Sequence, residues 1–310
     1  MRLTEIPADR IEHAEVLDGP AGKARDLVQR ALGNQRLKDA LHGVWLGHPL
    51  HPALAQVALG SFLSATLIDA SGGSQRESSR LVAAGLLASA PTAAAGWADF
   101  AEGHEEQQRV GLVHAGLNVC ALACYGGALL RRRGGRRGGR VLTAAGGALG
   151  GLSAALGGHL SFRLASGANH AEEVQHVGPG EWQPVGPVSE LPADTPVRRI
   201  IGDIPALVLR RNGASSAGNG AGEGAQGGAD EVTVLSDRCP HLSAPLHEGE
   251  LSSVDGELCI TCPWHSSVFQ VSDGAVVHGP ATAPVPRFET RIVNGTLQAR
   301  VRTLPGVDAS

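Results

Sequence analysis

Two cysteine and two histidine residues in the C-terminal half of the sequence constrain its fold most strongly. They follow the pattern Cys-x-His, twenty residues, Cys-x-x-His, and they are Cys239, His241, Cys262 and His265. Four soft ligands of this kind suit tetrahedral zinc or an iron–sulfur cluster. Zinc fingers usually pair like with like, whereas each short loop here offers one thiol and one imidazole. This pairing favours a [2Fe–2S] cluster in which one iron takes both thiolates and the other both imidazoles; zinc or a purely structural Cys/His set is the alternative.

The residues around these four side chains resemble the Rieske family. The resemblance covers roughly residues 190–303 and rests on three stretches: DRCPHLSAPLHEGEL (237–251), CPWHSSVFQVSDG (262–274) and HGPATAPVPRF (278–288). It implies an all-β Rieske-type iron–sulfur domain that transfers single electrons. It also implies that the two thiolates hold the iron that stays ferric, while the two imidazoles hold the iron that is reduced.

Three positions separate this chain from one branch of that family, and a fourth matches it. The Rieske proteins of cytochrome bc complexes carry a second cysteine in each loop, and these two form a disulfide clamp. The corresponding residues here are Ala244 and Trp264, so the domain resembles the Rieske-type ferredoxins that feed oxygenases. Ser267 stands where the respiratory proteins place a serine that donates to a cluster sulfide, whereas Phe269 replaces the tyrosine that accompanies it. The resemblance therefore implies one cluster hydrogen bond kept and another lost.

Alternating apolar and polar residues on both sides of the two loops predict a small antiparallel β domain. The expected strands are 231–236, 257–262 and 268–272, followed by a hairpin over 289–301 that turns at Asn294-Gly295. The Gly-rich stretch 212–230 matches neither a strand nor a helix, and we expect a flexible hairpin insertion there.

The loops themselves have two further features. Pro240 and Pro263 directly follow the paired cysteines and stiffen each turn, and short turns supply the backbone N–H donors that a cluster needs. Cys259 forms a Cys-x-x-Cys pattern with Cys262. We interpret Cys259 as a small apolar residue on the inward face of a strand, not as a ligand.

Four long apolar stretches occupy the N-terminal half, at 52–70, 81–100, 110–130 and 141–162. Each is close in length to the ~20 residues that a membrane-spanning helix requires. Gly146/Gly150 and Gly147/Gly151 have the spacing that lets membrane helices approach closely. The polar residues in or beside the stretches keep a soluble four-helix bundle open as an alternative; they are Gln56, Asp69, Asp99 and Asn118.

Charge in the loops predicts the orientation of these helices. The loop RRRGGRRGGR (131–140) has six arginines and no acid, whereas AEGHEEQQR (101–109) is acidic. Positive charge marks the cytoplasmic side, so we expect the N-terminus, the acidic loop and the cluster domain to face outward. The Arg pairs before the last stretch are interpreted either as a twin-arginine signal for export of a folded metal domain or as ordinary cytoplasmic charge.

The 310 residues divide into four predicted parts. Residues 1–46 read as a surface helix region instead of a signal peptide, and 47–166 form an all-α four-helix transmembrane bundle. A linker over 167–192 leads to the all-β Rieske domain over 193–305. The segment GHPLHPALAQVALGSFLSATLIDASG (47–72) resembles the start of an uncharacterised family of four-helix bacterial membrane domains, DUF2231, sometimes fused to Rieske domains.

Ionisable residues in the helical half predict a second site. His48, His51, Asp99, His114 and His159 all fall near the expected outer ends of their helices. Such residues are costly in membrane helices and are by default functional candidates. We expect a site for haem b or quinone there, with imidazoles that simply face water as the alternative.

Together these features predict a membrane-anchored electron-transfer protein in a bacterial cell membrane, with its cluster domain on the outer side. The expected partners are a redox protein or quinone, and membrane lipid; the formal net charge of −4 gives no reason to expect nucleic acid. One alternative is an oxidoreductase with haem or quinone chemistry in the helical half. Another is a ferredoxin component that delivers electrons to a separate oxygenase.

Overall fold

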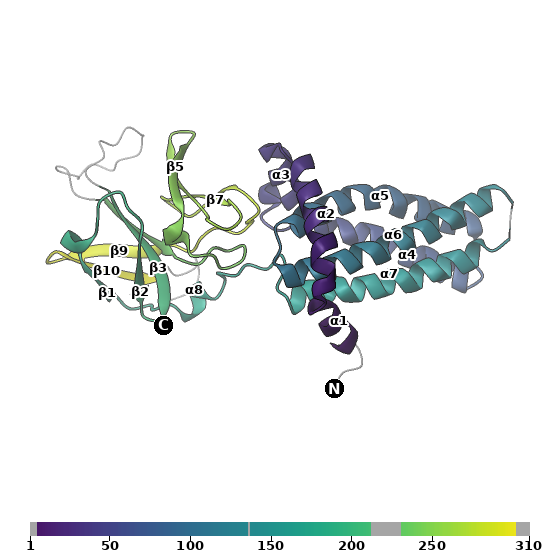
Figure 1. Ribbon diagram of the computed structural model, residues 1–310, viewed down its shortest axis with the longest axis horizontal. Coiled ribbons are helices and arrows are strands. Elements are labelled where there is room, and N and C mark those ends of the chain that lie inside the picture. The colour runs from purple at the N-terminus through teal and green to yellow at the C-terminus, as the bar shows by residue number, and fades with distance from the viewer. Residues whose placement is uncertain (1–4, 136, 212–230, 302–310) are drawn as a thin grey trace. The chain divides into compact units, whose positions relative to one another are not determined.

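The computed structural model describes residues 5–135, 137–211 and 231–301. The chain divides into two compact units, one ending at Ala168 and the other beginning at Asn169. The first unit is helical and the second is built of β-strands (Figure 1), as the sequence predicts. The expected flexible insertion at 212–230 lies outside the described residues.

Short helices precede the long ones in the first unit: α1 Glu5–Glu12, η1 Glu15–Leu17, α2 Asp18–Ala31, α3 Gln35–His42 and η2 Val44–Leu46. Asn34 caps α3 because its side chain accepts a hydrogen bond from the Leu37 N–H. Gly43 ends α3 with φ 85°, and a Cβ there would lie 2.3 Å from the His48 carbonyl oxygen. Only glycine therefore fits where the short helices turn into the long ones.

Four long helices form the body of the first unit: α4 Leu50–Ala70, α5 Gln75–Ala101, α6 Glu105–Arg133 and α7 Gly139–Phe162. Each is long and apolar enough to cross a membrane. Their outward faces carry large apolar side chains that are 45–78% exposed, which suits a lipid environment; these are Val57, Leu59, Leu63, Leu67, Leu87, Val119, Leu130, Val141 and Leu152.

An aromatic stack between glycines joins the long helices. The rings of Phe62 and Tyr125 lie 4.1 Å apart and nearly parallel. A Cβ on Gly85 would lie 2.6 Å from the Phe62 ring, and one on Gly146 would lie 2.9 Å from the Tyr125 ring. Gly146 and Gly147 thus allow close packing as predicted, whereas Gly150 and Gly151 have no described atom within 4 Å of an added Cβ.

Asp69, one of the polar residues that left a soluble bundle open, is buried in an ion pair with Arg132. Arg132 also donates to Ser78 Oγ (3.0 Å) and to Thr143 Oγ1 (2.7 Å). A buried charge is tolerated when it is paired and hydrogen-bonded, so Asp69 is compatible with an apolar bundle.

The described residues of the second unit form three antiparallel sheets. Their strand orders are β1-β10-β9, β2-β3-β4 and β5-β6-β7-β8. The strands are β1 Gln183–Pro187, β2 Val197–Ile201, β3 Ile204–Arg211, β4 Glu231–Ser236, β5 Glu250–Val254, β6 Glu257–Thr261, β7 Val268–Gln270, β8 Val276–His278, β9 Phe288–Val293 and β10 Thr296–Val301. All the predicted strands are present, and Asn294 and Gly295 turn the β9–β10 hairpin with φ of 50° and 75°.

The predicted linker over 167–192 is more structured than expected. It contains the short helix α8 Val174–Val177 and strand β1, which pairs with β10, so the β unit starts before residue 193. Pro184 and Pro187 are the residues that made a linker, not a strand, the expected structure here. They fit into β1 because it lies at the edge of its sheet, where a missing N–H is tolerated.

Candidate metal centre

The two loops that carry the Cys/His pairs have the same backbone geometry. In the loop between β4 and β5, the Cys239 N–H donates to Ala244 O (2.9 Å) and the Ser243 N–H donates to Cys239 O (2.9 Å). The loop between β6 and β7 repeats both bonds at the same offsets, from Cys262 to Ser267 O (2.8 Å) and from Ser266 to Cys262 O (3.2 Å). Ser243 and Ser266 both have positive φ, at 64° and 58°. The loops therefore present their side chains as a matched pair.

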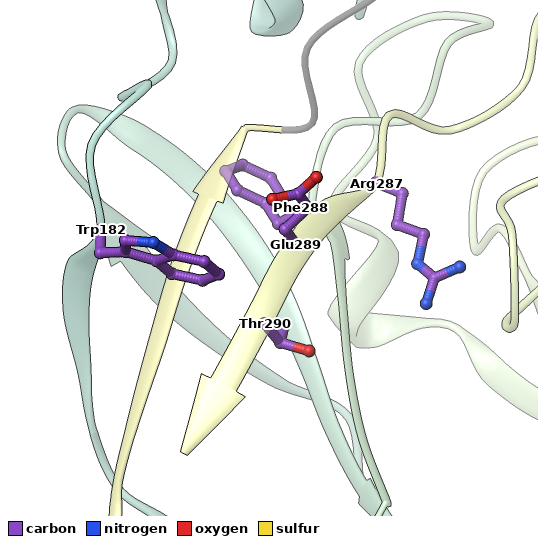
Figure 2. Close-up of a pocket in the computed structure, with 5 residues that line it drawn as sticks. All are labelled: Trp182, Arg287, Phe288, Glu289 and Thr290. Carbon is purple, nitrogen blue, oxygen red and sulfur yellow. The ribbon is translucent and has the colours of Figure 1, made fainter. Parts of the chain in front are cut away.

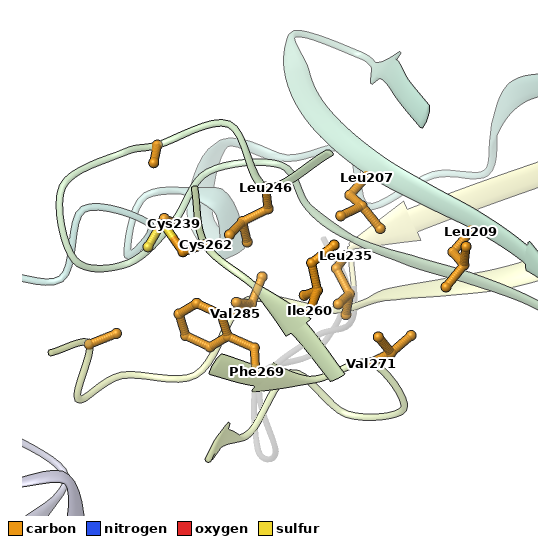
Figure 3. Close-up of a cluster of buried hydrophobic side chains, with 12 residues drawn as sticks. Leu207, Leu209, Leu235, Cys239, Leu246, Ile260, Cys262, Phe269, Val271 and Val285 are labelled. Carbon is orange, nitrogen blue, oxygen red and sulfur yellow. The ribbon is translucent and has the colours of Figure 1, made fainter. Parts of the chain in front are cut away.

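The thiols of Cys239 and Cys262 meet on the buried side of this pair of loops (Figure 3), and each side chain is no more than 2% exposed. The two sulfurs share a hydrogen bond, which raises the pKa of Cys239 and lowers the pKa of Cys262 to about 7. Burial acts to raise the pKa of both thiols, and a metal ion bound by the pair would displace their protons.

Backbone N–H groups point at both sulfurs. Those of His241 and Leu242 donate to Cys239, and those of Trp264 and His265 donate to Cys262. These are the donors that the short turns were expected to supply, and they favour the thiolate form of each cysteine.

The imidazoles of His241 and His265 form the other half of the centre. Their ring centroids lie 4.9 Å apart with the planes at 87°. Both residues are partly exposed, in contrast with the buried cysteines. The structure thus pairs thiol with thiol and imidazole with imidazole, which is the arrangement that a [2Fe–2S] cluster with two unlike irons needs. The residues present fit that group.

An apolar cluster supports the thiol side. Phe269, Ile260 and Leu246 are fully buried in the same apolar cluster as the two cysteines (Figure 3). Phe269 brings no hydroxyl to the place where the resemblance implies a tyrosine. Ala244 belongs to the same cluster, whereas Trp264 is 50% exposed.

Ser267 is fully buried, and its Oγ accepts a hydrogen bond from the Ala281 N–H (2.9 Å). Because that bond uses a lone pair, the hydroxyl proton remains available for donation, as a bond to a cluster sulfide requires. Cys259 lies in β6, is also buried, and donates to Glu257 O at 3.6 Å. Its position agrees with a packing role.

Asp237, which the sequence did not identify as a site residue, stabilises the loop between β4 and β5. Asp237 is 3% exposed and accepts from the backbone N–H of His247 (2.7 Å) and from its Nδ1 (2.8 Å). Its own carbonyl accepts from the Leu246 N–H (2.8 Å), so both ends of the loop are tied together. The spacing of ten residues between Asp237 and His247 follows no known periodicity, which is why the sequence pattern did not reveal it.

The candidate residues in the helical unit do not form one site. Asp99 pairs with His42 (3.0 Å) and His159 pairs with Glu12 (3.1 Å). His48 is exposed and contacts only the neighbouring Pro49 carbonyl (3.1 Å) among its hydrogen-bond partners in the described chain. Neither His42 nor Glu12 was identified as a partner, because each comes from the region interpreted as surface helix.

His51 and His114 are the two candidates that the structure brings together, with ring centroids 6.4 Å apart. Nδ1 of His51 bonds to Thr92 O (2.9 Å), and Nδ1 of His114 bonds to Ser153 O (2.8 Å). A carbonyl only accepts, so Nδ1 carries the proton in both rings and Nε2 is left as an acceptor. Nε2 of His114 accepts from Asn118 Nδ2 (3.1 Å), whereas Nε2 of His51 has no hydrogen bond recorded with the described residues.

A surface hollow elsewhere in the β unit is lined by Trp182, Arg287, Phe288, Glu289 and Thr290 (Figure 2). The guanidinium groups of Arg291 and Arg300 lie 4.3 Å and 4.7 Å from the centroid of the Trp182 ring. None of the predicted ligands lines this hollow, so it is separate from the metal centre.

Two family models match the chain. Residues 181–289 match the Rieske [2Fe-2S] domain, whose homologues carry a [2Fe–2S] cluster, and residues 47–175 match a predicted membrane protein family, DUF2231. Both resemblances expected from the sequence are thereby confirmed.

Two of the curated relatives are named ferredoxins. The anthranilate 1,2-dioxygenase ferredoxin subunit of Burkholderia cepacia is 31% identical over 121 residues, which are 39% of this chain and 93% of that protein. Ferredoxin CarAc of Metapseudomonas resinovorans is 36% identical over 66 residues, or 21% of this chain and 58% of that one. A solved ferredoxin of carbazole 1,9a-dioxygenase from Nocardioides aromaticivorans is 21% identical with a TM-score of 0.30, covering 39% of this chain and 99% of that one; a likeness of that size supports no conclusion.

Proposed function

Because the chain belongs to the Rieske [2Fe-2S] family through residues 181–289, we propose that it is a membrane-anchored carrier of single electrons. Its cluster is held by Cys239, His241, Cys262 and His265. The observation that carries this proposal is the sorting of these side chains into a buried thiol pair and a partly exposed imidazole pair. Bound there, a [2Fe–2S] cluster supplies reversible one-electron transfer.

The protein's own residues determine how electrons enter and leave. Cys239 and Cys262 would hold one iron within apolar packing, where the backbone N–H groups stabilise negative charge on the sulfurs. His241 and His265 would hold the other iron, and their partly exposed side chains offer a redox partner an approach to it. The ferredoxin relatives support a separate partner protein, such as an oxygenase or a reductase.

The helical unit serves as the membrane anchor. Support comes from four helices of sufficient length, from their exposed apolar side chains and from the match to a predicted membrane protein family. Since the loop 131–140 is rich in arginine, it lies in the cytoplasm and the cluster domain lies on the outer side.

Substitution of the ligands tests the site. Each of Cys239, His241, Cys262 and His265 changed singly to Ala should abolish the Rieske signal in the EPR spectrum, because an iron lacking one protein ligand cannot hold the cluster in this geometry. Cys259→Ala is the matched control, since it removes a buried thiol of the same domain. Loss of the signal in the control, with the signal kept in any one of the four variants, would contradict the assignment.

The His51–His114 pair favours a second candidate, an oxidoreductase in which the helical unit binds a hydroquinone. The hydroquinone O–H would donate to Nε2 of His51, which could take up its proton. A haem iron would instead need Nε2 of both rings as ligands, and Nε2 of His114 already accepts a hydrogen bond from Asn118. The structure therefore favours quinone over haem b within this candidate.

A further inference from the structure

Asp9, Glu12 and His159 form a cluster of metal-ligating side chains distant in sequence from the Cys/His loops. One ligand atom from each lies within 4.8 Å of the other two. His159 Nε2 and Glu12 Oε2 are 3.1 Å apart, and their side chains are only 9% and 15% exposed. We propose that these residues bind a divalent transition-metal ion, with Zn²⁺ as the ion that suits the set.

Packing holds α1 next to His159 before any ion arrives. Asp9 and Glu12 are three residues apart in α1 and share one face of the helix. Ala8 of the same helix is buried against Val110 of α6 and Leu156 of α7, which holds α1 beside His159. The Glu12 carbonyl also accepts from Arg109 Nη1 (3.0 Å). A preorganised ligand set loses little entropy on binding.

The donors match the proposed ion. Two carboxylates and one imidazole are ligands that Zn²⁺ accepts, and three protein ligands leave a position for water. Bond lengths near 2.0–2.2 Å place neighbouring ligands of a tetrahedral ion roughly 3.4 Å apart, close to the observed separation of Glu12 and His159.

Asp9 has one carboxylate oxygen with an ion-pair partner but no hydrogen-bond partner among the described residues. Its Oδ1 is buried but accepts no hydrogen bond from the described residues, although Arg163 Nη2 lies 3.4 Å away. Arg163 is 54% exposed, so it can remain as an outer partner of the carboxylate when an ion binds.

Zn²⁺ binding to the full chain tests the proposal. The protein is purified in detergent with its cluster intact and without a histidine tag, dialysed against a chelator and titrated with Zn²⁺. Elemental analysis should find one Zn²⁺ per chain, while the EPR signal of the cluster is unchanged. Glu12→Gln should weaken Zn²⁺ binding roughly tenfold or more, because a neutral amide is a poor ligand. Glu15→Gln, at an exposed position of the neighbouring turn, should bind as the wild type does.

Glu12→Gln also separates a metal site from a simple helix contact, because glutamine can still hydrogen-bond to His159. Asp9→Asn is a second variant, at a side chain that is 40% exposed and so tolerant of change. A wild type that retains no Zn²⁺, or variants that bind it as tightly as the wild type, would overturn the proposal and leave a hydrogen-bonded contact between α1 and α7.

Discussion

Among single residues, Ser267 bears most directly on the reduction potential. Its buried hydroxyl already accepts from the Ala281 N–H and keeps a proton to donate toward the thiol side of the centre. A donor to a cluster sulfur stabilises the more negative reduced form, so Ser267→Ala should lower the potential, on the order of 60 mV. A redox titration monitored by EPR measures the potentials of the wild type and the variant. Ser266→Ala, which changes the exposed neighbour, should leave the potential unchanged.

The reduction potential of the wild-type protein is predicted as well. Rieske centres span roughly −150 to +300 mV, and the missing clamp and the hydroxyl-free Phe269 place this one in the lower half of that range. A wild-type potential near the top, or no response to Ser267→Ala, would show that other donors set the potential.

Local spacing made the grouping of the two Cys/His pairs predictable, because all four residues lie in two short loops; that they hold a cluster stays a prediction. The helical candidates were less predictable. His51 and His114 are 63 positions apart, and their meeting depends on how α4 and α6 pack, which local spacing does not encode. Nor does the sequence show that Asp99 is engaged by His42.

At the level of secondary-structure elements, α4, α5, α6 and α7 together hold the His51–His114 pair. A Cβ on Gly96 of α5 would lie 2.7 Å from His51 Nδ1, and one on Gly157 of α7 would lie 3.3 Å from the His114 ring. These glycines let each imidazole lie against the neighbouring helix, where its Nδ1 reaches a carbonyl.

If the pair binds hydroquinone, His51→Ala and His114→Ala should each slow cluster reduction by added quinol in membranes, roughly tenfold or more. His48→Ala is the control, because this exposed imidazole contacts only Pro49 among the hydrogen-bond partners described for it. Normal rates in both variants would leave the helices as an anchor alone.

The presence of strands was predicted more reliably than the residues at which the β unit begins. The alternation in 289–301 and the Asn-Gly turn identified a hairpin because both signals are local. Strand β1 was missed because its prolines and glycine are typical of connectors, and only its pairing with β10 gives it a place in a sheet.

For the whole molecule, the proposed orientation is open to a direct test. A reporter active only outside the cytoplasm should be active when fused after Ser310 and inactive when inserted at Gly135, since the arginine-rich loop is expected to stay inside. The reverse pattern would place the cluster in the cytoplasm and remove the need to export a folded metal domain.

The EPR spectrum of washed membranes from cells that produce the full chain tests the membrane-anchored electron carrier most directly. Reduced membranes should show a Rieske signal that withstands washing with concentrated salt and is released only by detergent, because four apolar helices hold the chain in the bilayer. Membranes containing Cys262→Ala should lack the signal. A signal that remains in the soluble fraction, or membranes that contain the wild-type chain without any Rieske signal, would contradict the proposed function.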